Sequence, residues 1–183
     1  GNIILEHRVP DHLYIGNQFC HLLFPERKLL FEIIEKAAAE QVEITLVFSY
    51  IREYMLDYIT ELLDEINRWC EEKRQSVEIV VNDWGMASLV KKSRRNLIPS
   101  LGILLNKRRK DPRIPFKKGE QKWFERNSLN AGFYRNFLER EYGIQRFEWE
   151  SCGYEQQIPP GKNSLHIPFY QTNTSQYCPL GAV

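Results

Sequence analysis

The stretch that decides the fold class is residues 55–85, MLDYITELLDEINRWCEEKRQSVEIVVNDWG. Its first part places apolar residues three or four positions apart, which predicts a long amphipathic helix that ends in the charged run Glu71–Arg74. Its second part, Val77–Val81, is rich in β-branched residues and is followed by Asn82-Asp83-Trp84-Gly85, which predicts a strand and then a turn. A helix that leads directly into a strand is typical of an α/β fold.

The same alternation extends in both directions from this stretch. Short apolar runs predict further strands at 12–15, 42–48, 147–150 and 165–170, and a fourth strand within Leu97–Leu105, near Gly102–Leu105. Apolar residues at helical spacing predict further helices at 25–38, 86–92 and 128–142. About five alternations predict one α/β domain, residues 1–183, with a mainly parallel sheet. Because a complete eight-stranded barrel needs about 200 residues or more, we expect an incomplete or divergent TIM-barrel-like fold.

Composition excludes several classes of protein. Of the 183 residues, 43% are hydrophobic, which argues against a disordered chain. The 25 Lys and Arg are balanced by 24 Asp and Glu, so the chain is not basic throughout. No apolar stretch approaches the length of a membrane span, and the first residues show no basic segment followed by an apolar one. We therefore expect no membrane interaction and a cytoplasmic location.

In parallel α/β folds, functional residues gather where the strands end. Asp83, Asn106 and Glu150 follow or end predicted strands and are our candidate catalytic residues. Asp83 can instead cap the next helix. Glu148 and Glu150 share one strand face and suit acid–base chemistry or a hard metal, but the preferred interpretation is an exposed face of a half-buried strand. His166 is interpreted as structural.

The four cysteines, Cys20, Cys70, Cys152 and Cys178, lie far apart and form no CxxC pair. They are either reduced thiols or, for those near strand ends, ligands of a metal or cluster, because soft sulfur suits such groups. Cys20, Cys152 and Cys178 are the candidate ligands. Cys70 lies on an apolar helical face, and we expect it in the core.

Residues 106–126 form a basic segment with nine Lys or Arg and three Asp or Glu. Its Pro and Gly content predicts a long loop. Phe116 and Trp123 stand among the cations, and such a mixture can bind an anionic substrate or RNA, although a solvated loop has the same composition. The candidate substrate-binding residues are Lys107, Arg108, Arg109 and Arg113. The phosphate-loop, dinucleotide and esterase motifs are absent.

Five short motifs, in order along the chain, resemble those of the peptidase U-32 (collagenase-like) family. The first is the YxG strand end within 12–20, which Cys20 follows, and the second is Asn82-Asp83-Trp84-Gly85. The other three are the asparagine within 104–107, the glutamate-containing strand 147–150, and residues 172–180, which contain Cys178-Pro179. The resemblance implies a barrel-like α/β domain and a 4Fe–4S cluster for which Cys20 and Cys178 match two ligand positions. The family's arginine before the second cysteine is replaced here by Gln176 or Tyr177, and its further cysteines would lie beyond Val183.

Some family members are called peptidases, and others are linked to hydroxylation of RNA or of quinone precursors. The sequence does not support a protease, because it shows neither a Ser/His/Asp arrangement nor HExxH. The leading hypothesis is therefore a U-32-like protein of an RNA or small-molecule modification pathway. In this hypothesis the basic segment contacts an anionic substrate or RNA. The alternatives are a non-catalytic module that binds a protein or nucleic acid, and a metal-dependent hydrolase using Asp83, Glu148 and Glu150. A protein partner covering an open sheet edge is also expected.

Overall fold

The computed structural model describes residues 10–92, 94–109, 111 and 113–168, and the chain divides into two compact units, Gly1–Pro99 and Ser100–Val183. The boundary falls inside strand β4 (Leu97–Leu101). Among the described residues, no helix is long and apolar enough to cross a membrane.

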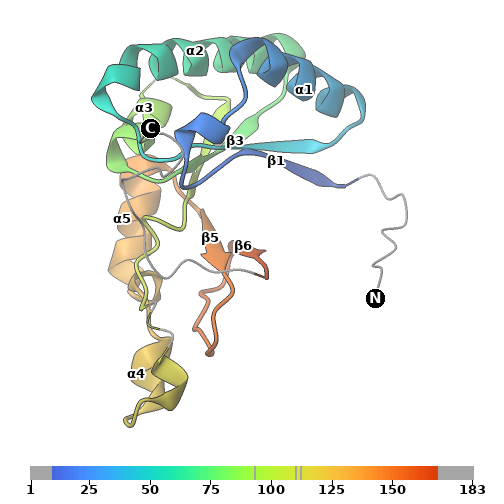
Figure 1. Cartoon of the computed structure of the whole chain (residues 1–183). Coiled ribbons are helices and arrows are strands. Elements are labelled where there is room, and N and C mark those ends of the chain that lie inside the picture. The colour runs from blue at the N-terminus through green and yellow to red at the C-terminus, as the bar shows by residue number, and fades with distance from the viewer. Residues whose placement is uncertain (1–9, 93, 110, 112, 169–183) are drawn as a thin grey trace, which may run out of the picture. The chain divides into compact units, whose positions relative to one another are not determined.

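The first unit is built from three parallel strands and three helices (Figure 1). β1 (His12–Gly16) pairs with β2 (Glu43–Val47), and β2 pairs with β3 (Val77–Val81), so spatial order follows chain order. The helices are α1 (Arg27–Ala39), α2 (Leu56–Lys73) and α3 (Trp84–Lys91). Figure 1 shows α1 and α2 on the same side of these strands.

The core of the first unit lies between its strands and helices. The apolar stripe predicted for α2 is buried, with Leu63 and Ile66 inaccessible to solvent. Cys70 on the same stripe is also inaccessible, which confirms its predicted place in the core. Between α2 and α1, Trp69 donates its indole N–H to Glu35 at 2.8 Å. The one polar atom of the Trp69 side chain therefore has a hydrogen-bond partner.

The second unit contains two further strands, β5 (Arg146–Glu150) and β6 (Lys162–His166), and helices α4 (Gln121–Glu125) and α5 (Gly132–Tyr142). The end of β4 pairs in parallel with β5, and β5 pairs in parallel with β6. Helix α5 ends at Gly143, whose φ of 72° lets its N–H and that of Ile144 close the last turn on Glu139 and Leu138.

The predicted α/β class with a mainly parallel sheet is confirmed, because every strand pairing described within the two units is parallel. The fourth strand lies within the predicted range Leu97–Leu105, but its finer position and the end of the last strand are wrong. The fourth strand ends at Leu101, and Gly102–Asn106 form a turn in which Asn106 N–H donates to the Gly102 carbonyl. The last strand ends at His166 rather than at residue 170, ahead of Pro168, which has no N–H for a ladder.

Short helices interrupt the basic segment. The prediction that 106–126 holds no continuous helix is confirmed, but α4 and a 3-10 turn at Ile114–Phe116 lie within it.

The expected single domain of 1–183 stays a prediction. The described residues contain six strands, whereas a complete (β/α)8 barrel has eight.

Candidate functional site

Two glutamates are buried on one face of β5. Glu148 is inaccessible to solvent and Glu150 is 4% exposed, so the preferred expectation of an exposed strand face is wrong. Both faces of β5 are covered, since Phe147 and Trp149 on the opposite face are buried as well. A carboxylate taken out of water is costly unless other groups compensate its charge, so the contacts of these two side chains define the site.

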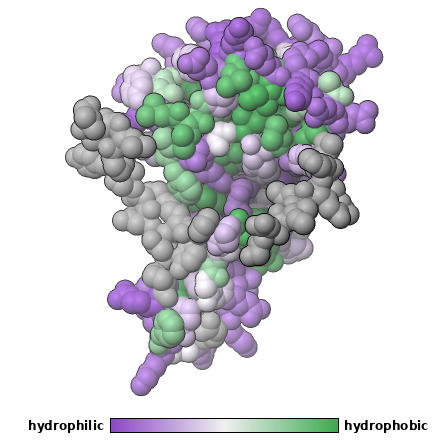
Figure 2. Space-filling view, turned by 45° about the vertical axis from the view of Figure 1, so that its right-hand side comes forward, coloured by the Kyte–Doolittle hydropathy of each residue, from purple (hydrophilic) through white to green (hydrophobic). Residues whose placement is uncertain are grey.

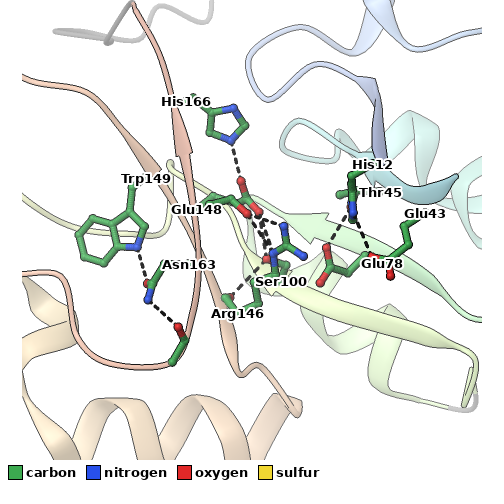
Figure 3. A network of polar contacts seen from close by, with 12 residues as sticks. His12, Glu43, Thr45, Glu78, Ser100, Arg146, Glu148, Trp149, Asn163 and His166 are labelled. Carbon is green, nitrogen blue, oxygen red and sulfur yellow. Dashed lines mark hydrogen bonds and ion pairs between the residues drawn. The ribbon is translucent and has the colours of Figure 1, made fainter. Parts of the chain in front are cut away.

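Glu148 is surrounded by polar groups from three strands (Figure 3). Nε2 of His166, at the end of β6, lies 2.6 Å from its Oε2. Ser100 of β4 donates its hydroxyl to Oε1 at 3.4 Å, and Nε of Arg146 lies 3.8 Å from the same oxygen. The His166 side chain is 36% exposed, so the pair joins a buried carboxylate to an imidazole that solvent can reach.

Glu150 is compensated by Arg108. Nη2 of Arg108 lies 3.1 Å from Oε1 of Glu150, and both side chains are 3% exposed. Nη1 of the same guanidinium donates to the main-chain oxygen of Glu150 at 2.9 Å. Arg108 therefore binds the strand end as well as the carboxylate, and its charge is used inside the protein.

Asn106 contributes a buried amide to the same strand end. Its Nδ2 donates to the main-chain oxygen of Glu148 at 3.0 Å, and the residue is 2% exposed. Its Oδ1 is buried and has no hydrogen-bond partner among the described residues. Buried polar atoms are normally paired, so this acceptor is able to receive a hydrogen bond from a water or a ligand.

Local chain geometry explains why these residues meet. The ladder between β4 and β5 reaches Leu101 and Phe147, and the turn at 102–106 then carries the chain away from β5. Beyond this point β4 no longer donates hydrogen bonds to β5. The Asn106 side chain donates to the Glu148 carbonyl instead, and the Arg108 side chain donates to the Glu150 carbonyl. Two residues along a strand are about 6.6 Å apart, so both side chains cross to β5 next to each other.

The structure thus brings together three of the predicted site residues, Asn106, Arg108 and Glu150. The pairing of Glu148 with His166 was not among the predictions from the sequence. A usable signal was present, because His166 ends β6 in register with Glu150, and polar residues that end neighbouring parallel strands meet at one sheet edge.

Asp83, the third predicted catalytic residue, belongs to the first unit and begins α3. Its Oδ1 accepts a hydrogen bond from the Met86 N–H at 2.8 Å, as a helix cap does. Its Oδ2 accepts from the Ile51 N–H, also at 2.8 Å. Backbone groups therefore hold both carboxylate oxygens, which matches the capping alternative.

Several cations of the basic segment contact other groups of the protein. Lys107 donates to the Leu104 carbonyl at 2.9 Å, and Arg109 donates to the Trp123 carbonyl at 2.6 Å. Arg113 binds Asp111 through two nitrogens, at 2.9 and 3.1 Å, and Lys117 adds a contact of 2.5 Å. The hydrogen bonds from Arg113 and Lys117 hold the pKa of Asp111 well below its usual range.

The candidate cysteine ligands fall in different parts of the chain. Cys20 follows β1 in the first unit, and its N–H donates to the Asn17 side chain at 3.0 Å. Cys152 follows β5 in the second unit, where its thiol contacts the Tyr154 carbonyl at 3.1 Å. Cys178 lies outside the described residues. Within the described residues, no three His, Cys, Asp or Glu side chains are grouped as a metal site requires.

A second polar row crosses the strands of the first unit (Figure 3). Nε2 of His12 contacts the hydroxyl of Thr45, which donates to Glu78 Oε2 at 2.9 Å, while Nδ1 of His12 lies 3.2 Å from Glu43. Thr45 is inaccessible to solvent. Because these residues pair across β1, β2 and β3, the row satisfies buried polar groups between strands.

No family model matches the chain, and neither the curated proteins nor the solved structures contain a significant match.

Proposed function

We propose that this protein is a U-32-like α/β enzyme in which His166, oriented by Glu148, transfers protons on a small polar substrate, in an RNA or small-molecule modification pathway. The observation that carries the proposal is the 2.6 Å contact between the inaccessible carboxylate of Glu148, in the middle of β5, and the partly exposed imidazole of His166, which ends the parallel neighbour β6. The barrel-like fold and the U-32 relationship are part of the proposal and rest on the resemblance of the motifs.

The Glu148–His166 pair has the geometry of an orienting carboxylate and a general acid–base group. The carboxylate fixes the orientation of the ring, and the exposed side of the imidazole can reach a bound molecule. Histidine suits this role because its ordinary pKa lies near neutrality, so it can both give and accept a proton.

The cost of the polar cluster supports a role beyond stability. Buried ion pairs of this kind can often be replaced by apolar residues without loss of stability, because desolvation offsets much of the charge attraction. Glu148, Glu150 and Arg108 together keep three ionisable side chains at or below 4% exposure. Asn106 adds an unpaired acceptor, which would receive a hydrogen bond from a hydroxyl or amine of the substrate.

The iron–sulfur cluster belongs to the same proposal. It is supported by Cys20, which follows β1 and is partly accessible, and by the place of Cys178 in the chain. Anaerobic purification followed by iron and acid-labile sulfide analysis tests it, with Cys70→Ser as the control for Cys20→Ser and Cys178→Ser. Iron and sulfide that persist in the control and are lost in the other two variants would support a cluster, whereas a metal-free, colourless protein contradicts it.

A second candidate function is a binding module that uses the basic segment. The observation in its favour is an open hollow of about 620 Å³ lined by residues such as Arg109, Lys117 and Trp123, with Phe116 87% exposed nearby in the chain. Its partner would be a nucleic acid or protein that stacks on these rings. The test compares the proteins and RNA that are retained by the wild type, Phe116→Ser and Trp123→Ser. If both variants retain the same molecules as the wild type, this candidate fails.

Complementation of a deletion strain tests the leading proposal. Wild type, Glu148→Gln, His166→Gln and the surface control Glu139→Gln are expressed in the strain, and nucleosides and small metabolites are compared by mass spectrometry. We expect the wild type and Glu139→Gln to reverse the changes caused by the deletion, and the other two to fail although they are folded. An unchanged deletion profile, or full reversal by all four proteins, contradicts the proposal.

A further inference from the structure

The first unit contains a cavity of about 260 Å³ at the carboxyl ends of β1 and β2. Its lining includes Phe24, which follows β1, Phe48 and Ser49, which follow β2, and Tyr58 and Ile59 of α2. An enclosed apolar cavity of about 150 Å³ is sufficient for benzene, so this volume admits a ring with a substituent. Mostly apolar walls with a few polar groups are typical of small-molecule sites.

Gly16 is the residue that allows the wall to form. It ends β1 with a φ of 110°, and a Cβ there would lie 2.3 Å from the Val47 carbonyl oxygen and 2.8 Å from the Phe24 ring. Without a side chain at this position, Phe24 packs against the strand ends and stacks on Phe48, with ring centres 4.5 Å apart. The aromatic wall therefore depends on the glycine that terminates β1.

Ser49 supplies a buried polar group in this apolar lining. The residue is 5% exposed, and the described contact of its hydroxyl is 3.5 Å to the Tyr50 carbonyl, which is long for a hydroxyl donor. A ligand group could therefore offer this hydroxyl a better partner. At the rim, Nε2 of His21 lies 3.3 Å from the Tyr54 hydroxyl.

Charge and surface character narrow the class of ligand. Within the part of the chain that the structure describes, the lining contains no lysine or arginine, and its carboxylate belongs to Glu26, which is exposed. Apart from the imidazole of His21, the lining therefore offers an anion no basic side chain. Leu22 in the lining is 64% exposed, and Figure 2 shows hydrophobic side chains gathered on the visible face. From these features we infer that the cavity binds an uncharged aromatic ring with one hydrogen-bonding substituent, which Ser49 recognises.

Binding of phenol, toluene and benzoate, measured by ligand-observed NMR and by thermal shift, tests this inference. We expect phenol to bind more tightly than toluene, and benzoate least. Ser49→Ala should weaken phenol binding by about 3- to 10-fold, the value of one hydrogen bond, and leave toluene unchanged. Leu22→Trp should block the mouth and weaken both by about 10-fold or more, while Leu29→Trp, an exposed leucine of α1 outside the lining, should bind like the wild type.

The inference is overturned if none of the rings binds the folded wild type, if benzoate binds best, or if Leu22→Trp binds phenol as the wild type does. Equal loss of phenol and toluene in Ser49→Ala would overturn the role of the hydroxyl. The result is independent of the proton-transfer proposal, because Glu148 and His166 belong to the other unit and are untouched by these variants.

Discussion

Arg108 binds Glu150 at two points. One guanidinium nitrogen donates to the main-chain oxygen of Glu150 at 2.9 Å, and the other lies 3.1 Å from its carboxylate, with both side chains 3% exposed. An arginine that sequence composition assigns to a solvent-facing basic segment is therefore part of the interior. Its charge stabilises a buried carboxylate instead of an external phosphate.

Breaking this pair from one side should be more harmful than removing both partners. Glu150→Gln leaves a buried guanidinium uncompensated, and Arg108→Met leaves a buried carboxylate, so each should lower the free energy of unfolding by about 3–5 kcal/mol. The double variant Arg108→Met/Glu150→Gln should lose clearly less than the sum of the two single losses, because neither charge is then left buried alone. Urea unfolding of the four proteins measures the coupling, and strictly additive losses would refute a coupled pair.

Gly16→Ala should be strongly destabilising. The added Cβ would meet the Val47 carbonyl and the Phe24 ring, and the backbone holds a φ of 110° that L-residues rarely adopt. We expect a loss of about 3 kcal/mol or more, or failure to fold, from strain of about 1–3 kcal/mol together with overpacking of a similar size. Gly132→Ala is the control, since it begins α5 and its nearest neighbour would be 3.9 Å away. Equal thermal stability of the two variants would contradict this account of the β1 end.

Cys70 should resist alkylation in the native state. Burial, with a smaller contribution from Glu71, raises the pKa of its thiol to about 11, so almost no thiolate exists at pH 8. Iodoacetamide labelling followed by peptide mass spectrometry should modify Cys70 only after denaturation. Rapid native labelling of this residue would show that the helix face is not packed as described.

The same group makes stability depend on pH in alkaline solution. The native state holds the thiol proton of Cys70 more tightly than the unfolded chain does, so the thiol contributes to the free energy of unfolding. This contribution is complete below about pH 8.5, the ordinary thiol pKa, and is lost as the pH rises toward 11. Cys70→Ala should flatten the decline of stability over that interval. An identical decline in the variant would assign the effect to other groups.

Asp111 should limit the affinity of the basic segment for polyanions. It engages Arg113 and Lys117 directly, and its own pKa is lowered by them, so it is charged at any neutral pH. Asp111→Asn should therefore release two cations and raise the salt concentration needed to elute the protein from heparin. Glu61→Gln, on the exposed side of α2, makes the same change in net charge. Coincident elution of the two variants would show that net charge alone matters.

Much of the fold was predictable because local pattern and tertiary role agree. The apolar spacing in 55–70 and the β-branched run at Val77–Val81 gave a helix and a strand where the structure has them. The fourth strand was placed too late, because Gly102–Leu105 is apolar for a different reason: it is a buried turn. Local periodicity does not separate a buried turn from a short strand.

The candidate site was only partly predictable for a related reason. Asn106 and Glu150 were chosen because polar residues at strand ends meet at one edge, and they do share the end of β5. Alternation in Phe147–Glu150 suggested that the glutamates face solvent, because alternation usually marks a half-buried strand. They are buried because Arg108 and His166, distant in sequence, supply compensating groups.

By itself, the sequence determined the α/β class, a mainly parallel sheet and the core face of α2, because alternating strand and helix patterns indicate the first two and a 3.6-residue apolar period indicates the third. Tertiary structure alone decided which polar residues are distant partners: Glu148 with His166, Glu150 with Arg108, and Oδ2 of Asp83 with the Ile51 N–H. The reason is physical. A buried charge is tolerated only where long-range contacts place a compensating group, and no local pattern records those contacts.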